Sequence, residues 1–138
     1  MLAAAIGPAL ARDAPAQTLD EVFSRVSPTV VVVRAKGRDV TARGITPFNE
    51  TGSGVLISSD GRVMTAAHVV NGEDEITVQG IGGEVVRATL LSANDAADVA
   101  MLQLERVTAA MRVARISDSD SVRIGERVMV IGAPYGLA

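Results

Sequence analysis

The sequence predicts an all-β fold, built from short extended segments separated by turns. Hydrophobic residues make up 48% of the 138 residues and aromatic residues only 2%, so the core consists of Val, Ile, Leu and Ala, and the β-branched members of that set favour strands. Short apolar runs also alternate with turn residues, a spacing typical of a barrel or a sandwich. These runs span residues 29–35, 54–57, 63–66, 75–79, 84–91, 99–104 and 127–131.

A short helix is predicted before the first strand. Thr18 and Glu21 end a Thr-Leu-Asp-Glu capping box, in which the threonine caps the helix N-terminus and the glutamate reaches back. Pro28 ends the helix, because the residue before a proline avoids helical geometry. An apolar stripe recurs at helical spacing and comprises Leu19, Val22, Phe23 and Val26. We expect this stripe to dock on the body that follows.

Turns and loops are expected between the strands. Glycine-containing segments at residues 59–61, 71–72 and 80–83 supply the positive φ that tight turns require. Residues 38–49 are polar and contain Gly44 and Pro47, so they are expected to form the longest surface loop. Residues 117–121 offer several N-caps for one helical turn before the last predicted strand.

Composition excludes several classes of function. The net charge of −3 and the pI near 5.1 leave no basic stripe, and the absence of Trp with a single Tyr leaves no stacking platform for bases, so nucleic-acid binding is not expected. The absence of cysteine excludes disulfides, thiolate metal sites and a cysteine nucleophile. Nothing in the sequence requires a cofactor.

The N-terminus indicates a compartment. Residues 2–11 form an uncharged apolar run ending in Ala-Leu-Ala, which resembles the cleavage site of a signal peptide. The run is far shorter than the roughly 20 apolar residues that cross a bilayer, so no membrane span is expected. We therefore expect residues 1–17 to be a signal-peptide remnant and linker, and the protein to be periplasmic or secreted.

Two residues could share a hydrolytic site. His68 is the only histidine and follows the apolar run 63–66, while Asp98 comes directly before the run 99–104. A histidine at the end of one strand, with a carboxylate heading another, suits a general base whose second ring nitrogen is held by an acid. A lone histidine is otherwise usually an ordinary core or surface residue. Metal binding is the weaker functional alternative, because no second His or any Cys stands at ligand spacing.

The surroundings of the two residues refine this hypothesis. Ala66 and Ala67 leave space beside the imidazole. An acid that supports an imidazolium must be shielded from water, and we expect the apolar strand 99–104 to shield Asp98. Asp95 is interpreted as a residue whose side chain caps a turn.

Three segments in this order resemble the HtrA (Deg) family of trypsin-like serine proteases. They are Thr-Gly-Ser-Gly-Val-Leu-Ile at 51–57, Gly-Arg-Val-Met-Thr-Ala-Ala-His-Val-Val at 61–70 and Asp-Ala-Ala-Asp-Val-Ala-Met-Leu at 95–102. The resemblance implies that His68 is the general base and Asp98 the orienting acid. It also implies unfolded or misfolded proteins as substrates and a homo-oligomer, a trimer in this family.

The resemblance also implies the architecture. Residues 18–138 would be the N-terminal part of a trypsin-like protease domain, namely its first six-stranded antiparallel β-barrel with the first strand of the second barrel, preceded by the short helix. The family's Gly-x-Ser-Gly-Gly segment, which carries the nucleophile and the oxyanion hole, has no counterpart in the sequence. Ser53 is its nearest lookalike, and we interpret it as a structural residue. The 138-residue chain alone is therefore predicted to be inactive.

Two alternatives stay open at this point. A non-catalytic pseudoprotease or chaperone-like barrel would bind exposed apolar or extended polypeptide segments. A purely structural β-module would carry His68 and Asp98 incidentally.

Overall fold

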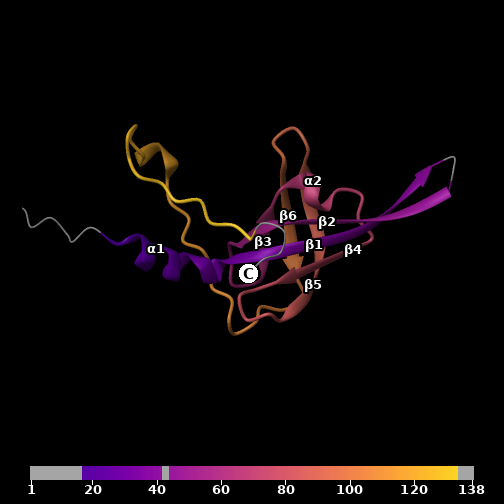
Figure 1. The fold of residues 1–138 in the computed structure, drawn as a ribbon, viewed down its shortest axis with the longest axis horizontal. Helices are drawn as coiled ribbons and strands as arrows, with labels where there is room; N and C mark the ends of the chain where they lie inside the picture. Colours follow the sequence, from indigo (N-terminus) through magenta and orange to yellow (C-terminus); the bar gives the residue numbers. More distant parts are fainter. Residues whose placement is uncertain (1–16, 42–43, 134–138) are drawn as a thin grey trace, which may run out of the picture.

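A computed structural model describes residues 17–41 and 44–133. The predicted signal-peptide remnant and linker, residues 1–17, lies outside this range except for Gln17. Six antiparallel strands close into a barrel in the order β1-β2-β3-β6-β5-β4 (Figure 1). The strands are β1 (Val30–Thr41), β2 (Gly44–Leu56), β3 (Arg62–Thr65), β4 (Glu75–Gln79), β5 (Val85–Asn94) and β6 (Val99–Leu104). The all-β class and the six-stranded antiparallel barrel are confirmed.

The core is aliphatic, as the composition predicts. Alternate residues of each strand point into the barrel, and those from all six strands meet there. The side chains that are at most 1% exposed include Val31, Val33, Ala35, Leu56, Val63, Val78, Val86, Ala100 and Leu102. Gly54 lies among them, and a β-carbon at this position would come within 2.7 Å of Val63 Cγ1. The barrel interior is thus filled by small branched side chains and has no room for a larger residue at Gly54.

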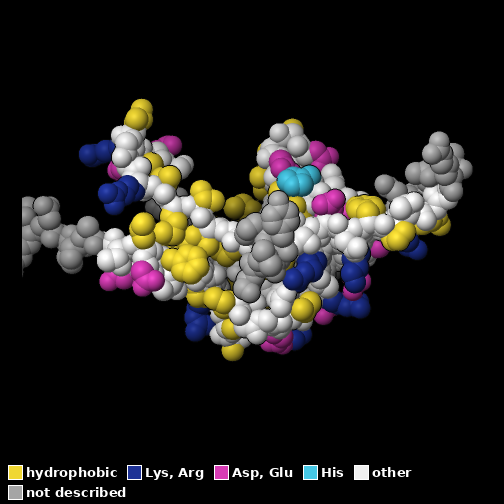
Figure 2. Space-filling model, in the orientation of Figure 1, with side chains coloured by type: hydrophobic (Ala, Val, Ile, Leu, Met, Phe, Trp, Pro, Cys, Tyr) yellow, Lys and Arg dark blue, Asp and Glu magenta, His cyan; other side chains and the backbone are white. Residues whose placement is uncertain are grey.

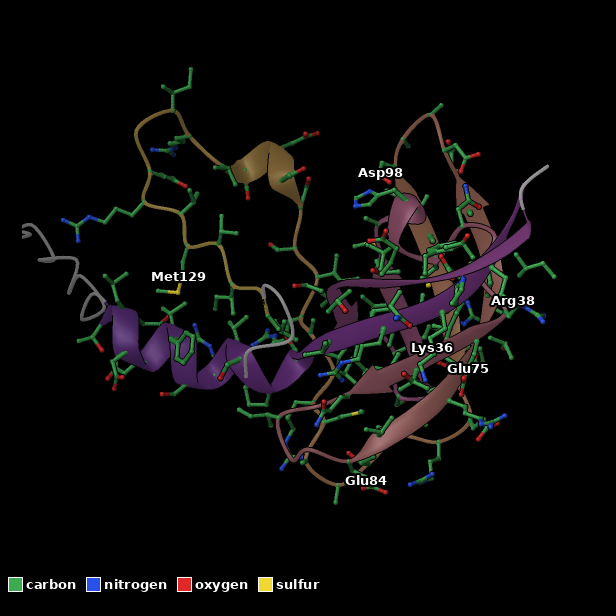
Figure 3. The ribbon with its side chains drawn as sticks, turned by 45° about the vertical axis from the view of Figure 1, so that its right-hand side comes forward. Lys36, Arg38, Glu75, Glu84, Asp98 and Met129 are labelled. Atoms are coloured by element: carbon green, nitrogen blue, oxygen red, sulfur yellow. The ribbon has the colours of Figure 1, made fainter. Side chains whose placement is uncertain are left out.

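The predicted loop at 38–49 is wrong, because these residues extend β1 and β2 into a two-stranded arm. The antiparallel register continues from Lys36↔Asn49 to Thr41↔Gly44, and the arm projects beyond the barrel in Figure 1. Arg38 Nε binds Asp74 Oδ2 at 2.7 Å, and Lys36 faces Glu75 at 3.9 Å (Figure 3). These ion pairs join the base of the arm to the start of β4. Pro47 is tolerated because the outer edge of the arm has no neighbouring strand at that point.

The predicted helix forms but does not dock. Helix α1 (Leu19–Val26) has the capping box: the Glu21 N–H donates to Thr18 Oγ1 at 3.2 Å, and the Thr18 N–H donates to Glu21 Oε2 at 2.9 Å. None of its residues is buried, and Leu19 and Phe23 are 62% and 52% exposed. The short 3₁₀ turn η1 (Ser27–Thr29) runs straight into β1 and leaves no slack for α1 to fold back. The helix therefore extends away from the barrel (Figure 1).

The predicted strand at 127–131 does not form. After β6 the only regular element in the described chain is η2 (Ser119–Ser121), the single turn expected at 117–121. Val128 and Val130 are 79% and 95% exposed, because a strand needs a partner and each barrel strand is already paired on both sides. The chain after β6 leaves the barrel at Ala114, whose N–H bonds Leu56 O at 2.8 Å. It passes near α1, with Met129 extending toward the helix (Figure 3).

No helix in the two described ranges combines the length and the apolar character needed to cross a membrane.

Candidate active site

His68 lies on a single helical turn at one end of the barrel. Helix α2 (Ala67–Val70) follows β3 directly. Three of its four residues, Ala67, Val69 and Val70, are buried against the barrel, and His68 is the exposed one. The buried valines thus fix the helix, while the imidazole points outward from the barrel rim.

Asp98 lies at the end of the turn that joins β5 to β6. The Asp98 N–H bonds Asp95 O at 3.3 Å, and the Ala97 N–H bonds Asn94 Oδ1 at 3.0 Å. Asp98 has φ +51° and is the one non-glycine residue with positive φ in the described chain. This left-handed conformation is uncommon for a side-chain-bearing residue, although Asp tolerates it better than most.

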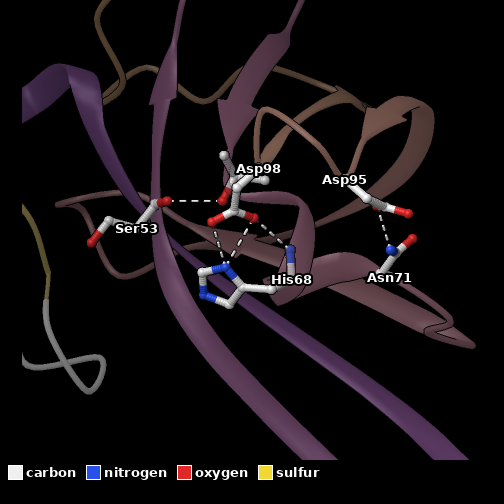
Figure 4. A network of polar contacts seen from close by, with 6 residues as sticks. Ser53, His68, Asn71, Asp95 and Asp98 are labelled. Atoms are coloured by element: carbon white, nitrogen blue, oxygen red, sulfur yellow. Dashed lines mark hydrogen bonds and ion pairs between the residues drawn. The ribbon is translucent and has the colours of Figure 1, made fainter.

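The two side chains meet as predicted. His68 Nδ1 lies 2.8 Å from Asp98 Oδ2 and 3.0 Å from Oδ1, and the His68 backbone N–H donates to Oδ1 at 3.0 Å (Figure 4). Because a carboxylate only accepts, this contact assigns the ring proton to Nδ1 and leaves the Nε2 lone pair free. The predicted proximity of His68 and Asp98 is confirmed.

The same contacts stabilise the charged form of Asp98. The pKa of Asp98 is lowered from its ordinary value, first by the His68 backbone N–H and then by the imidazole, while the loss of some solvation acts in the opposite direction. The lowered pKa keeps the carboxylate in the charged form that accepts the bond from Nδ1–H.

The expected shielding of Asp98 is wrong. The His68 and Asp98 side chains are 70% and 51% exposed. The pleat of β6 sends Ala100 and Leu102 into the barrel interior, where they are 1% and 0% exposed, and Val99 is itself 41% exposed. Strand β6 thus gives its apolar side chains to the core rather than to the carboxylate, and the pair lies on an open surface (Figure 2).

Asp95 does not cap the turn through its side chain. Its Oδ1 accepts a hydrogen bond from Asn71 Nδ2 at 2.6 Å (Figure 4), and the Asn94 side chain supplies the cap instead. The sequence predicts Asn71 only as a turn residue before Gly72, which does have positive φ. Its side-chain bond to Asp95 depends on the tertiary fold and has no signal in the sequence.

Ser53 is a structural residue. Its carbonyl accepts from Thr65 Oγ1 at 2.8 Å, and its Oγ accepts from the Ala133 N–H at 2.8 Å. Figure 4 shows its hydroxyl directed away from the His68 ring. Ser53 therefore joins β2 to β3 and to the returning end of the described chain. Within that part of the chain, no hydroxyl bonds Nε2 of His68 and no group of three or more His, Asp or Glu side chains could hold a metal ion.

Comparisons with known proteins agree with this geometry. Residues 52–138 match the family model of the trypsin-like peptidase domain. The chain is 32% identical over 146 residues to the periplasmic pH-dependent serine endoprotease DegQ of Escherichia coli. The aligned region covers 93% of this chain and 32% of DegQ. It is 41% identical over 86 residues to a probable periplasmic serine endoprotease, DegP-like, of Halomonas elongata, covering 62% of this chain and 18% of the relative.

A solved structure also shares the fold. The HtrA-type protease AlgW with decapeptide superposes with a TM-score of 0.72 at 21% identity, covering 88% of this chain and 43% of that chain. The chain spans about a third of the length of DegQ. The matched domain and the closed barrel agree with these similarities to Deg and HtrA-type proteases: the chain belongs to the trypsin-like peptidase family.

Proposed function

We propose that this chain supplies the general base and the orienting acid of a serine endopeptidase that degrades unfolded or misfolded proteins in the bacterial envelope. The observation that carries the proposal is the contact of Asp98 with Nδ1 of His68 at 2.8 Å, which leaves Nε2 free to accept a proton. The periplasmic names of the relatives support the location. Residues 18–138 would form the N-terminal part of the protease domain.

His68 and Asp98 would act through proton transfer. Nε2 of His68 takes the proton of a serine hydroxyl as its oxygen attacks the peptide carbonyl, and later gives that proton to the leaving amine. Asp98 holds the ring in the Nδ1–H tautomer and stabilises the imidazolium. The exposed imidazole leaves space for the nucleophile and the substrate to approach.

The nucleophile and the oxyanion hole are proposed to belong to a Gly-x-Ser-Gly-Gly segment that is not among the 138 residues. A homo-oligomer, with the trimer that the family resemblance implies, is likewise a proposal. The exposed apolar face of α1 is available for such contacts.

A chimaeric protease tests the proposal. Residues 18–133 of this chain would replace the matching part of E. coli DegQ, with casein as substrate. We expect casein hydrolysis that His68→Ala abolishes and that Asp98→Asn lowers by roughly 10⁴-fold, because an asparagine donates to Nδ1 and moves the ring proton to Nε2. Asp120→Asn, on η2, is the control and should retain activity. A folded but inactive chimaera that still binds unfolded casein would favour the non-catalytic barrel.

The 138-residue chain alone gives a second test. Purified without the DegQ segment, it should not hydrolyse casein, because it encodes no oxyanion hole. If hydrolysis persisted and disappeared with His68→Ala, the chain would contain a nucleophile after all, and Ser53→Ala would be the first variant to examine.

A further inference from the structure

A second hydrogen bond joins the two segments that carry His68 and Asp98. Asn71 follows α2 in the loop after His68, and Asp95 opens the turn that ends at Asp98. The 2.6 Å bond from Asn71 Nδ2 to Asp95 Oδ1 joins the same two segments as the contact between the imidazole and the carboxylate (Figure 4). The two segments are thus held together at both ends.

The barrel ladder does not fix these segments by itself. Pairing of β5 with β6 ends at Asn94↔Val99, so residues 95–98 lie beyond the ladder, and all four are exposed. Helix α2 is a single turn without a side-chain N-cap. Buried Val69 and Val70 hold α2 on the barrel, whereas residues 95–98 are all exposed. Side-chain bonds from α2 and the loop after it therefore help to set the distance and angle between the ring and the carboxylate.

The backbone conformation of Asp98 also depends on the side-chain bonds around it. A non-glycine residue at φ +51° persists when its surroundings determine its conformation, since the left-handed region costs free energy for such residues. Apart from the His68 contact, the turn is held by its backbone bond from the Asp98 N–H to Asp95 O, by the Asn94 cap and by the Asp95 side chain. Loss of the Asp95 contact would allow the turn to relax and Asp98 to rotate away from the ring.

The hydrogen bond between Asn71 and Asp95, called the tether below, has a chemistry that suits a position beside Asp98. An amide donor binds the Asp95 carboxylate through a charge-assisted hydrogen bond. It also adds no cation, whereas a lysine or arginine at this position would compete with His68 for the Asp98 carboxylate. The Asn71–Asp95 bond can thus hold the turn without disturbing the electrostatic interaction between His68 and Asp98.

We infer that Asn71 and Asp95 are positioning residues, whose hydrogen bond keeps the Asp98 carboxylate against Nδ1 of His68. The catalytic consequence rests on the proposed function; the geometric one does not. Neither side chain touches the reacting atoms. The tether therefore acts only through the tautomer and orientation of the imidazole.

The test uses the single histidine of the chain. In protein labelled with ¹⁵N-histidine, the two ring nitrogens of His68 give one set of NMR signals, which report the fraction of neutral ring protonated at Nδ1. We expect the Nδ1–H tautomer to dominate in the unmodified chain. Asn71→Asp places two carboxylates at the bond and should lower that fraction. The swap Asn71→Asp with Asp95→Asn exchanges donor and acceptor and should restore it.

A control and a kinetic readout complete the test. Asp74→Ala removes an exposed side-chain bond of similar length, to Arg38 on the arm, and should leave the tautomer unchanged. In the chimaera, Asn71→Asp should lower kcat by roughly 10- to 100-fold with little change in KM, and the swap should recover most of it.

The outcomes separate the two proposals. Unchanged tautomer in Asn71→Asp, or failure of the swap to restore it in a folded protein, overturns the tether. An unmodified chimaera without activity, combined with the expected tautomer series, overturns the proposed function and leaves the tether in place.

Discussion

Val69 packs against the backbone of Gly52 so closely that a β-carbon added at Gly52 would lie 2.6 Å from Val69 Cγ2. Val69 neighbours His68 on α2, so this contact sets how near the histidine helix lies to β2. The other glycine of the Thr-Gly-Ser-Gly segment, Gly54, instead faces the core. One glycine therefore makes room for the helix that carries the site, and the other for the barrel interior.

Gly52→Ala should destabilise the protein by about 1–3 kcal/mol, because it overpacks the contact with Val69. Urea unfolding measures this change. Val69→Ala leaves space for the new methyl group, so the double variant should be less destabilised than the sum of the two single variants. Additive costs would show that the alanine is accommodated elsewhere.

Thr18→Ala should weaken α1 without changing the barrel. Loss of the N-cap costs about 1 kcal/mol of helix stability, but no residue of α1 is buried. Far-ultraviolet circular dichroism should show reduced helix content, while the unfolding midpoint of the barrel stays the same. Ser24→Ala, at an exposed interior position of α1, should not reduce the helix content. A barrel midpoint that falls with Thr18→Ala would mean that α1 docks in solution.

The free energy of unfolding should fall in acid, in part through Asp98. Its pKa is lowered in the folded state, so its contribution is fully present above the ordinary pKa of an aspartate and is lost as the pH falls through the lower folded-state pKa. Asp98→Asn should flatten the dependence below the ordinary pKa of an aspartate, and asparagine also tolerates the left-handed backbone.

Asp60 should also contribute to the acid dependence of the free energy of unfolding, and it serves as a reference for Asp98. Its pKa is lowered mainly by the Ser58 hydroxyl. Asp60→Asn should remove a separate part of the acid dependence, additive with that of Asp98→Asn. Denaturant unfolding across the pH range measures both, and an unchanged slope in Asp98→Asn would contradict the lowered pKa.

The segment after η2 should promote self-association. Ile124, Val128 and Val130 are 109%, 79% and 95% exposed, and Figure 2 shows hydrophobic side chains gathered over α1 and the neighbouring end of the chain. Val128→Ser with Val130→Ser should shift the protein toward monomer in sedimentation velocity. Val113→Ser, at a less exposed site, is the control. Equal sedimentation of all forms would show that this surface does not recruit other chains.

The sequence predicted the barrel because each of its strands has one buried face, and this gives apolar alternation. The arm has no such alternation, because residues 44–50 of β2 are mostly exposed, and its turn-rich composition therefore predicts a loop. His68 and Asp98 could be predicted because their motifs are local. The bond from Asn71 to Asp95 could not, since both residue types are common in turns and only the closed barrel brings them together.

The closure of the barrel also decides which parts of the protein open first. Within the closed barrel every strand has a partner on each side, so the amide protons there should exchange with solvent only through global unfolding. The arm, α1 and the mostly exposed residues 115–130 can instead open locally at low cost. Helix α2 is fastened to the barrel by buried Val69 and Val70, and Asp98 directly precedes β6. The helix that carries His68 therefore belongs to the slowest-opening unit, and its contact with Asp98 should outlast the local opening of α1 and of residues 115–130.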